Sequence, residues 1–155
     1  AFGEGNRLFT EFKGALTENF VLQTLMTQFE VTPRYWSQAN PPYEVDFLIQ
    51  RDNDIFPIEV KSESNTTSKS LKKFKELFPD KVKLRIRYSL DNLKLDDEVL
   101  NIPLFMAGQT DHLIELALKE KNRLSKNFIS FIKRGLFNII APFSYTKKDA
   151  RNRHL

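Results

Sequence analysis

Several residue types are scarce or missing in this 155-residue chain, and each absence narrows the possible functions. No cysteine is present, which excludes disulfides and thiolate metal sites. The two histidines, His112 and His154, are too isolated to suggest a metal site or a catalytic dyad. The five glycines form no phosphate-binding loop, so any ATPase activity would belong to another region of a longer protein. No apolar run approaches the roughly 18 to 20 residues of a membrane span, and no leader is recognisable, which predicts a cytoplasmic protein with no membrane association.

The residues that are present indicate one ordinary globular domain followed by a basic extension. Apolar residues make up 41% of the chain, 14 of them Phe, which is enough for a real core. Residues 1–118 carry 14 Lys and Arg against 18 Asp and Glu, whereas residues 119–155 carry 10 against 2. We expect the extension to be partly helical, with its last ten residues disordered. A chain that begins with Ala is consistent with a piece of a longer protein and equally with removal of Met.

The first strong pattern predicts a helix over residues 8–29. Spacing of 100° per residue puts Ala15, Leu22 and Leu25 on one apolar stripe, with an adjoining stripe through Phe20. Glu18 falls in the first stripe, and burying a carboxylate there is costly unless a cation meets it. Glu18 is therefore either a site residue with a partner or a residue at the edge of the core.

Two β-rich runs, residues 44–50 and 55–62, flank the turn formers Asp52 and Asn53 and predict a β-hairpin. If Asp52 and Asn53 form a two-residue turn, the numbers of paired residues add up to 105. Asp46 then lies opposite Glu59, a pairing of like charges that destabilises a sheet unless a cation lies between them. Two converging carboxylates suit a hard divalent cation such as Mg²⁺.

The same register places Glu44 opposite Lys61, so a plain cross-strand salt bridge competes with any catalytic role for Lys61. Glu59 and Lys61, taken alone, would be an ordinary surface pair in most proteins.

A second helix is expected over residues 69–78, with Leu71, Phe74, Leu77 and Phe78 facing inward and Pro79 ending it. A strand over residues 81–90 alternates apolar and basic positions. Its basic face could contact a nucleic-acid backbone, and a solvated strand face is at least as good an interpretation. The basic positions are Lys81, Lys83, Arg85 and Arg87.

Beyond this strand the pattern is less regular. Residues 98–108 suggest a final extended segment, and a helix should start at Thr110 or Asp111 and run to about Leu124. A separate docking helix could follow in the Phe- and Ile-rich part of the extension.

Glu18 on a helix, Asp46 on a strand and Glu59-Val60-Lys61 on the next strand, followed by a helix and a strand, resemble the PD-(D/E)XK nuclease superfamily. More narrowly, the segments "FKGALTENFVLQTL", "YWSQ", "EVDFLI", "PIEVKS" and "NIPLFMAG" look like the uncharacterised domain that follows the nucleotide-binding domain in many prokaryotic AAA-type ATPases. The resemblance covers about residues 8–118. It departs from the superfamily pattern at Val45, where the name of the superfamily expects Pro.

The resemblance implies a restriction-endonuclease-like α/β core, with a central mixed sheet of about four to five strands flanked by helices. It implies that Asp46, Glu59 and the backbone carbonyl of Val60 hold Mg²⁺ or Mn²⁺, with Glu18 completing the site, and that Lys61 orients or activates the attacking water. The domain boundaries expected are a nuclease-like domain over residues 1–118 and the extension over residues 119–155.

Three functions follow from these observations. The first is a Mg²⁺-dependent DNA nuclease, as part of a protein that carries an AAA-type ATPase domain in the same chain. The second is a non-catalytic module that binds DNA or a protein partner of that ATPase, because a fold does not determine a function. The third is a structural domain whose basic tail serves self-association.

Overall fold

The structure is a computed structural model that describes residues 2–30, 33–61 and 68–144. The chain divides into two compact units, residues 1–118 and residues 119–155. No helix in the described part of the chain is long and apolar enough to cross a membrane.

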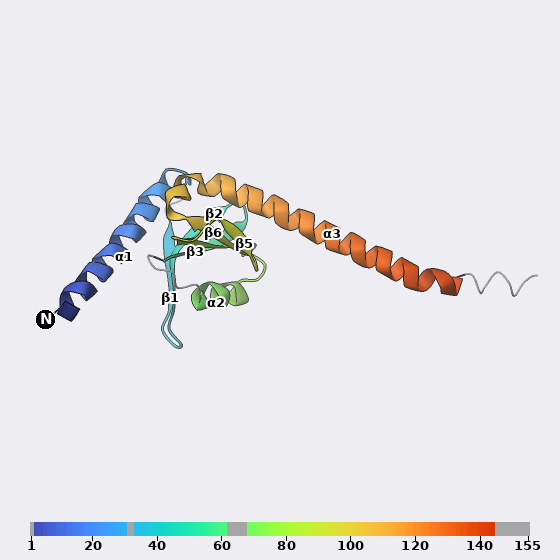
Figure 1. Ribbon diagram of the computed structural model, residues 1–155, viewed down its shortest axis with the longest axis horizontal. Coiled ribbons are helices and arrows are strands. Elements are labelled where there is room, and N and C mark those ends of the chain that lie inside the picture. The colour runs from blue at the N-terminus through green and yellow to red at the C-terminus, as the bar shows by residue number, and fades with distance from the viewer. Residues whose placement is uncertain (1, 31–32, 62–67, 145–155) are drawn as a thin grey trace, which may run out of the picture. The chain divides into compact units, whose positions relative to one another are not determined.

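The first unit is an α/β domain built on a six-stranded sheet. Its order in the chain is one helix, three strands, a second helix, three strands, a short 3₁₀ helix and the start of a third helix (Figure 1). The elements are α1 Phe2–Met26, β1 Arg34–Gln38, β2 Tyr43–Arg51, β3 Asp54–Val60, α2 Lys69–Leu77, β4 Arg85–Ser89, β5 Lys94–Asp96, β6 Val99–Pro103, η1 Leu104–Gln109 and α3 Thr110–Ser144.

The sheet has the strand order β1-β2-β3-β4-β6-β5 and is mixed. The strands β1, β2 and β3 form an antiparallel meander, β3, β4 and β6 run parallel, and β5 closes the far edge antiparallel to β6. The expected mixed α/β architecture is confirmed, with one strand more than the four to five expected. The additional strand, β5, has only three residues, two of them charged, and offers no apolar alternation from which to predict a strand.

The hairpin of β2 and β3 has the expected register. Paired residues run from Arg51 opposite Asp54 to Phe47 opposite Ile58, and their numbers add up to 105 throughout. The turn is made by Asp52 and Asn53, and Asp52 has a positive φ of 54°. Aspartate adopts this left-handed conformation more readily than most residues, which explains its place at the turn.

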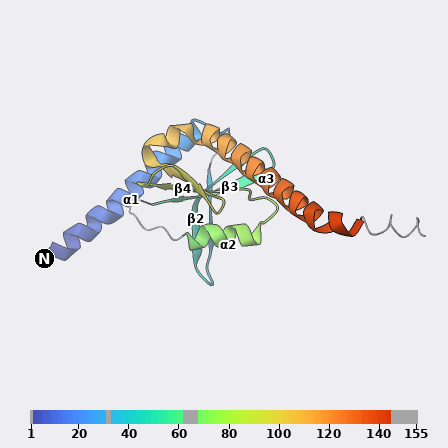
Figure 2. The same cartoon turned by 45° about the vertical axis from the view of Figure 1, so that its right-hand side comes forward.

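The two faces of the sheet are covered by different helices. On one face α2 buries Leu71 and Phe74 against Val45 and Val82, with Trp36 packed edge-on to Phe74 at a centroid distance of 5.2 Å. On the other face the carboxyl end of α1, η1 and the start of α3 cover the larger cluster (Figures 1 and 2).

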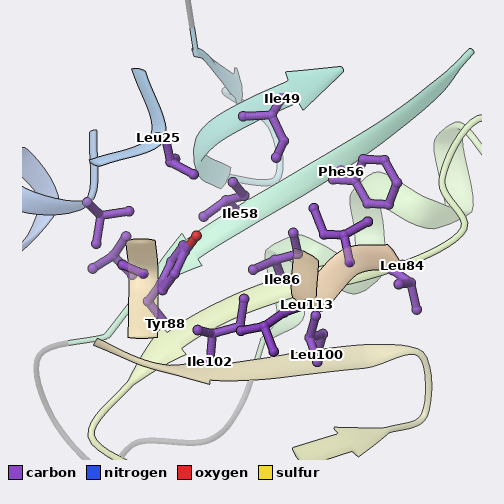
Figure 3. Close-up of a cluster of buried hydrophobic side chains, with 14 of the residues drawn as sticks. Leu25, Ile49, Phe56, Ile58, Leu84, Ile86, Tyr88, Leu100, Ile102 and Leu113 are labelled. Carbon is purple, nitrogen blue, oxygen red and sulfur yellow. The ribbon is translucent and has the colours of Figure 1, made fainter. Parts of the chain in front are cut away.

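The larger cluster joins α1, the sheet, η1 and the start of α3. Figure 3 shows Leu25 from α1 and Leu113 from α3 against apolar side chains of the sheet. The sheet residues labelled there are Ile49, Phe56, Ile58, Leu84, Ile86, Tyr88, Leu100 and Ile102.

A regular strand would turn Val45 and Ile49 to the same face, because side chains alternate with a period of two. Instead, Val45 packs on the α2 side and Ile49 on the α1 side. The pairing with β1 explains the difference: Arg34 lies opposite Leu48 and Trp36 opposite Val45, so two steps along β1 match three along β2. The strand β2 therefore carries one extra residue, a β-bulge, at Asp46 or Phe47.

The apolar stripe expected on the first helix is wrong for its middle turns. Val21 and Leu25 are fully buried, but Ala15 and Glu18 are exposed and Leu16 and Phe20 are 55% and 51% exposed. The spacing along the helix is right, but the sheet covers only its carboxyl end.

The second helix also packs differently at its end. Leu71 and Phe74 face the core as expected, whereas Leu77 and Phe78 are exposed by 45% and 40%. The helix ends at Leu77, so Phe78 no longer follows the buried stripe.

The helix α3 begins at Thr110, as expected, and continues without a break to Ser144. The expected end near Leu124 is wrong, since no proline or glycine interrupts the pattern before Gly135. In the second unit, Arg123 forms an i,i+3 ion pair with Glu120, and Leu124 and Phe128 are exposed. The disorder expected for the last ten residues concerns positions outside the described residues.

Candidate active site

Asp46 lies at the β-bulge, where the regular ladder between β2 and β3 ends. The last pair of the ladder is Phe47 opposite Ile58. Two residues beyond, the backbone N–H of Val60 donates a hydrogen bond to Oδ2 of Asp46 at 2.6 Å. The bulge thus turns the carboxylate of Asp46 toward the end of β3, and β-bulges often aim a side chain in this way next to functional sites.

The pKa of Asp46 is raised from its usual 3.8 to about 6. Burial is the main cause, because it disfavours the charged carboxylate, and repulsion from Glu18 and Glu59 adds to it. The hydrogen bond from Val60 and the positive charge of Lys61 act in the opposite direction. Three other residues selected from the sequence therefore act electrostatically on Asp46, namely Glu18, Glu59 and Lys61.

Glu59 is the most buried carboxylate of the site, with a side chain only 9% exposed. Its Oε1 forms an ion pair with Nζ of Lys61 at 2.9 Å. Its Oε2 accepts a hydrogen bond of 2.5 Å from the hydroxyl of Ser68, and that hydroxyl accepts bonds from Nε and Nη2 of Arg87. Both oxygens of Glu59 are therefore held by donors.

Lys61 forms its ion pair with Glu59 and not with Glu44. The ammonium binds the carboxylate two residues earlier, near the end of β3, and it also lowers the pKa of Asp46. Among the residues that the structure describes, no salt bridge joins Lys61 to Glu44, whose side chain is exposed. Lys61 thus faces the carboxylates of the candidate site.

Glu18 occupies a different environment from the one expected. Its side chain is exposed, so no buried cation is needed to compensate its charge. It still contributes to the repulsion that raises the pKa of Asp46, which places it on the side of α1 that approaches the site. Glu18 is thus a solvated neighbour of Asp46.

The donor types present fit a magnesium ion, but their arrangement is incomplete. Mg²⁺ is commonly held by one or two carboxylates together with waters and substrate phosphate, and Asp46 and Glu59 supply two. No group of three or more His, Asp or Glu side chains in the described ranges could hold a metal. Val60 meets Asp46 through its N–H, whereas the role expected for it uses the carbonyl oxygen. To bind a metal, the Glu59 carboxylate would have to give up its ion pair with Lys61 or its hydrogen bond with Ser68.

The first two residues of the expected basic strand face, Lys81 and Lys83, do not lie on a strand. The strand β4 begins at Arg85, so Lys81 and Lys83 belong to the connection before it. Both are exposed, and both contact the hairpin turn: Nζ of Lys81 donates to Oδ1 of Asn53 at 2.9 Å, and Nζ of Lys83 lies 2.7 Å from Oδ2 of Asp54. They brace the turn and remain accessible.

The other two residues of the expected basic face, Arg85 and Arg87, differ more strongly from the solvated face that was expected. The side chain of Arg85 is only 7% exposed, and its Nη2 contacts the carbonyl oxygen and the carboxylate of Asp97. Arg87 is partly buried and binds Ser68. The expectation of an open basic face is therefore wrong at Arg85, because α2 and the β5–β6 hairpin cover the side of the strand that the alternation had assigned to solvent.

Sequence reasoning missed Ser68 as a site residue. It falls in a Ser- and Thr-rich stretch that offers several helix caps, and it is indeed the N-cap residue of α2. Its side chain caps nothing, because its hydroxyl is engaged by Glu59 and Arg87. No pattern along the chain distinguishes this serine from its neighbours.

The fold and the site define an α/β domain with a mixed sheet that carries two carboxylates and a lysine where adjacent strands end. Residues 13–105 match the family described as a domain of unknown function, DUF4143. Since the match covers more than half of the chain, the protein belongs to this family. Comparisons with curated proteins and with solved structures gave no match.

Proposed function

We propose that this domain is a Mg²⁺-dependent nuclease, or a nuclease module, of the PD-(D/E)XK superfamily that hydrolyses phosphodiester bonds of DNA. The observation that carries the proposal is the raised pKa of Asp46. A partly buried carboxylate that other carboxylates repel is a candidate functional group, because a divalent cation would relieve the repulsion.

Each residue of the site has a role in this proposal. A bound Mg²⁺ would lower the pKa of a water ligand and neutralise charge on the phosphate. Asp46 and Glu59 would hold the ion. Lys61, released from Glu59, would orient the attacking water and place a positive charge beside the phosphate. Glu18 is exposed and would act through a water molecule.

The test is cleavage of plasmid and linear DNA in the presence of Mg²⁺ or Mn²⁺. We expect activity in the wild type and its loss in Asp46→Asn and Lys61→Ala. Two controls match these changes in charge: Glu44→Gln, on the same strand as Asp46, and Lys73→Ala, an α2 lysine that pairs with Glu76. Cleavage that persists in both site variants, or that never occurs, would refute the proposal.

A second candidate is a nuclease-derived module that binds DNA or protein without cleaving. The engagement of both Glu59 oxygens by Lys61 and Ser68 favours it, because such a closed network stabilises the site without an ion. This module would bind DNA in the presence of a chelator, with an affinity that falls steeply as salt rises and that Asp46→Asn leaves unchanged.

Two further parts of the proposal rest on the sequence. The association with an AAA-type ATPase domain in the same chain follows from the resemblance of the sequence segments over residues 8–118. We also propose a cytoplasmic location, because no apolar run of the sequence approaches the length of a membrane span.

A further inference from the structure

A pocket of about 660 Å³ lies between the start of α2, the strand β4 and the β5–β6 hairpin. Several of its lining side chains are cationic or donate hydrogen bonds. Those that matter for its chemistry are Ser68, Lys72, Arg85, Arg87 and Asn101. The volume is within the range of pockets that hold small ligands.

Arg87 is a partly buried guanidinium without a carboxylate partner in the described part of the chain. It lies directly across from Glu59 in the parallel pairing of β3 and β4, yet Glu59 is neutralised by Lys61. The contacts of Arg87 are two hydrogen bonds, from Nε at 2.9 Å and from Nη2 at 2.5 Å, to the neutral hydroxyl of Ser68. A partly buried charge that meets only a neutral group favours a counter-ion.

Arg85 adds a second guanidinium to the same wall, and this one is buried. Its side chain is 7% exposed, and its Nη2 is held by Asp97. Its Nε is buried and makes no hydrogen bond within the described residues. Buried polar groups are nearly always paired, so this N–H indicates an acceptor that a ligand or a water in the pocket would supply.

The amino end of α2 contributes positive potential to the same place. Ser68, the N-cap residue, does not cap the helix with its side chain, so the first-turn N–H groups lack that acceptor. Lys72, one turn into the helix, lines the pocket with an exposed side chain.

Acidic residues also line the pocket, but two of the three are already paired. Asp97 binds Arg85, and Asp96 binds Lys94 at 2.8 Å. Asp91 is the third, and it is exposed. With those pairs set aside, Lys72 and Arg87 face one carboxylate, and the pocket keeps an excess of positive charge.

We propose that this pocket binds a phosphate group, with Arg87 and Lys72 as its principal donors and the amino end of α2 beside them. The proposal does not depend on cleavage or on metal. Because Ser68 bonds both Arg87 and Glu59, an occupied pocket lies next to the candidate active site.

The test is titration of the full chain with inorganic phosphate by calorimetry, in the presence of a chelator. Lys72→Gln and Arg87→Gln should each weaken phosphate binding at least tenfold. The matched control is Lys73→Gln, the next residue on the same helix, which pairs with Glu76 and does not line the pocket. It should change the affinity less than twofold.

Competition identifies the source of the phosphate. If a single-stranded oligonucleotide without a terminal phosphate displaces inorganic phosphate, the pocket takes the nucleic-acid backbone; if it does not, the pocket takes a small phosphate compound.

Lys72 is exposed, so its variant keeps the test valid even where Arg87→Gln does not fold. The inference is overturned if the wild type does not bind phosphate, or if Lys73→Gln weakens binding as much as Lys72→Gln. A wild type that binds phosphate but never cleaves DNA would refute the proposed function alone.

Discussion

Replacing Asp46 with Asn should make the first unit more stable at neutral pH. The raised pKa means that folded Asp46 holds its proton more tightly than unfolded Asp46, so ionisation opposes folding. The stabilising effect of the protonated form is complete below the unfolded pKa of 3.8 and is lost as the pH rises through about 6. The asparagine side chain cannot ionise, and its carbonyl oxygen can still accept the hydrogen bond from Val60.

The magnitude follows from the difference between the two pKa values. A pKa that rises from 3.8 to about 6 corresponds to at most about 3 kcal/mol. Solvent screening at this partly exposed side chain lowers the expected effect to about 1–2 kcal/mol. Asp46→Asn should therefore exceed the wild type by about 1–2 kcal/mol in the free energy of unfolding at pH 8, and the difference should shrink toward zero near pH 3.5.

Urea denaturation at a series of pH values measures this difference. Trp36 is the only tryptophan and packs against Phe74 in the first unit, so its fluorescence reports on that unit. Glu44→Gln, on the exposed part of the same strand, should show little change. A destabilised Asp46→Asn, or a difference that stays constant between pH 4 and pH 8, would show that burial and repulsion do not raise the pKa of Asp46. Millimolar Mg²⁺ should stabilise the wild type at pH 8 but not this variant.

Three further predictions concern the packing around the site. Lys61→Ala should destabilise the first unit by about 1–3 kcal/mol in urea, since it leaves a buried glutamate without its cation; an unchanged midpoint contradicts this. Thr110→Val should lower the melting temperature more than Tyr88→Phe, because it leaves the buried Tyr88 hydroxyl unpaired, whereas in Tyr88→Phe the Thr110 hydroxyl still bonds a backbone carbonyl. Equal shifts in melting temperature would contradict this. Phe20→Ser should change the free energy of unfolding by less than about 0.5 kcal/mol, whereas Leu25→Ala should lower it by about 2–5 kcal/mol, because only Leu25 is fully buried. A larger loss for Phe20→Ser than for Leu25→Ala would contradict the burial described for α1.

The hairpin register could be predicted from the sequence because it depends on local chemistry. Asp52 and Asn53 favour a two-residue turn, and the length of a turn fixes the register of the strands beside it. The ladder ends at Phe47 opposite Ile58, so the expected pairing of Asp46 with Glu59 is not formed, although Glu59 and Lys61 still act electrostatically on Asp46. The sequence offered both Glu59 and Glu44 as partners of Lys61, and it could not select Glu59, because the bulge at Asp46 changes the local geometry and depends on β1.

Long-range packing explains the other differences. Periodicity found the apolar stripe of α1, but it cannot tell that the sheet reaches only Val21 and Leu25. Alternation placed Arg85 on an open face, yet α2 and the β5–β6 hairpin cover it. Both errors concern what lies opposite an element, which depends on chain segments remote in sequence.

The proposed function requires Asp46 and Glu59 to hold a divalent cation together. Anomalous diffraction from crystals soaked in Mn²⁺ tests it most directly, because manganese can be located without reference to the side chains. The proposal predicts a peak between the two carboxylates, with Glu59 released from Lys61 or Ser68. Crystals in which Lys61 and Ser68 still hold Glu59, with no peak beside Asp46, would contradict it.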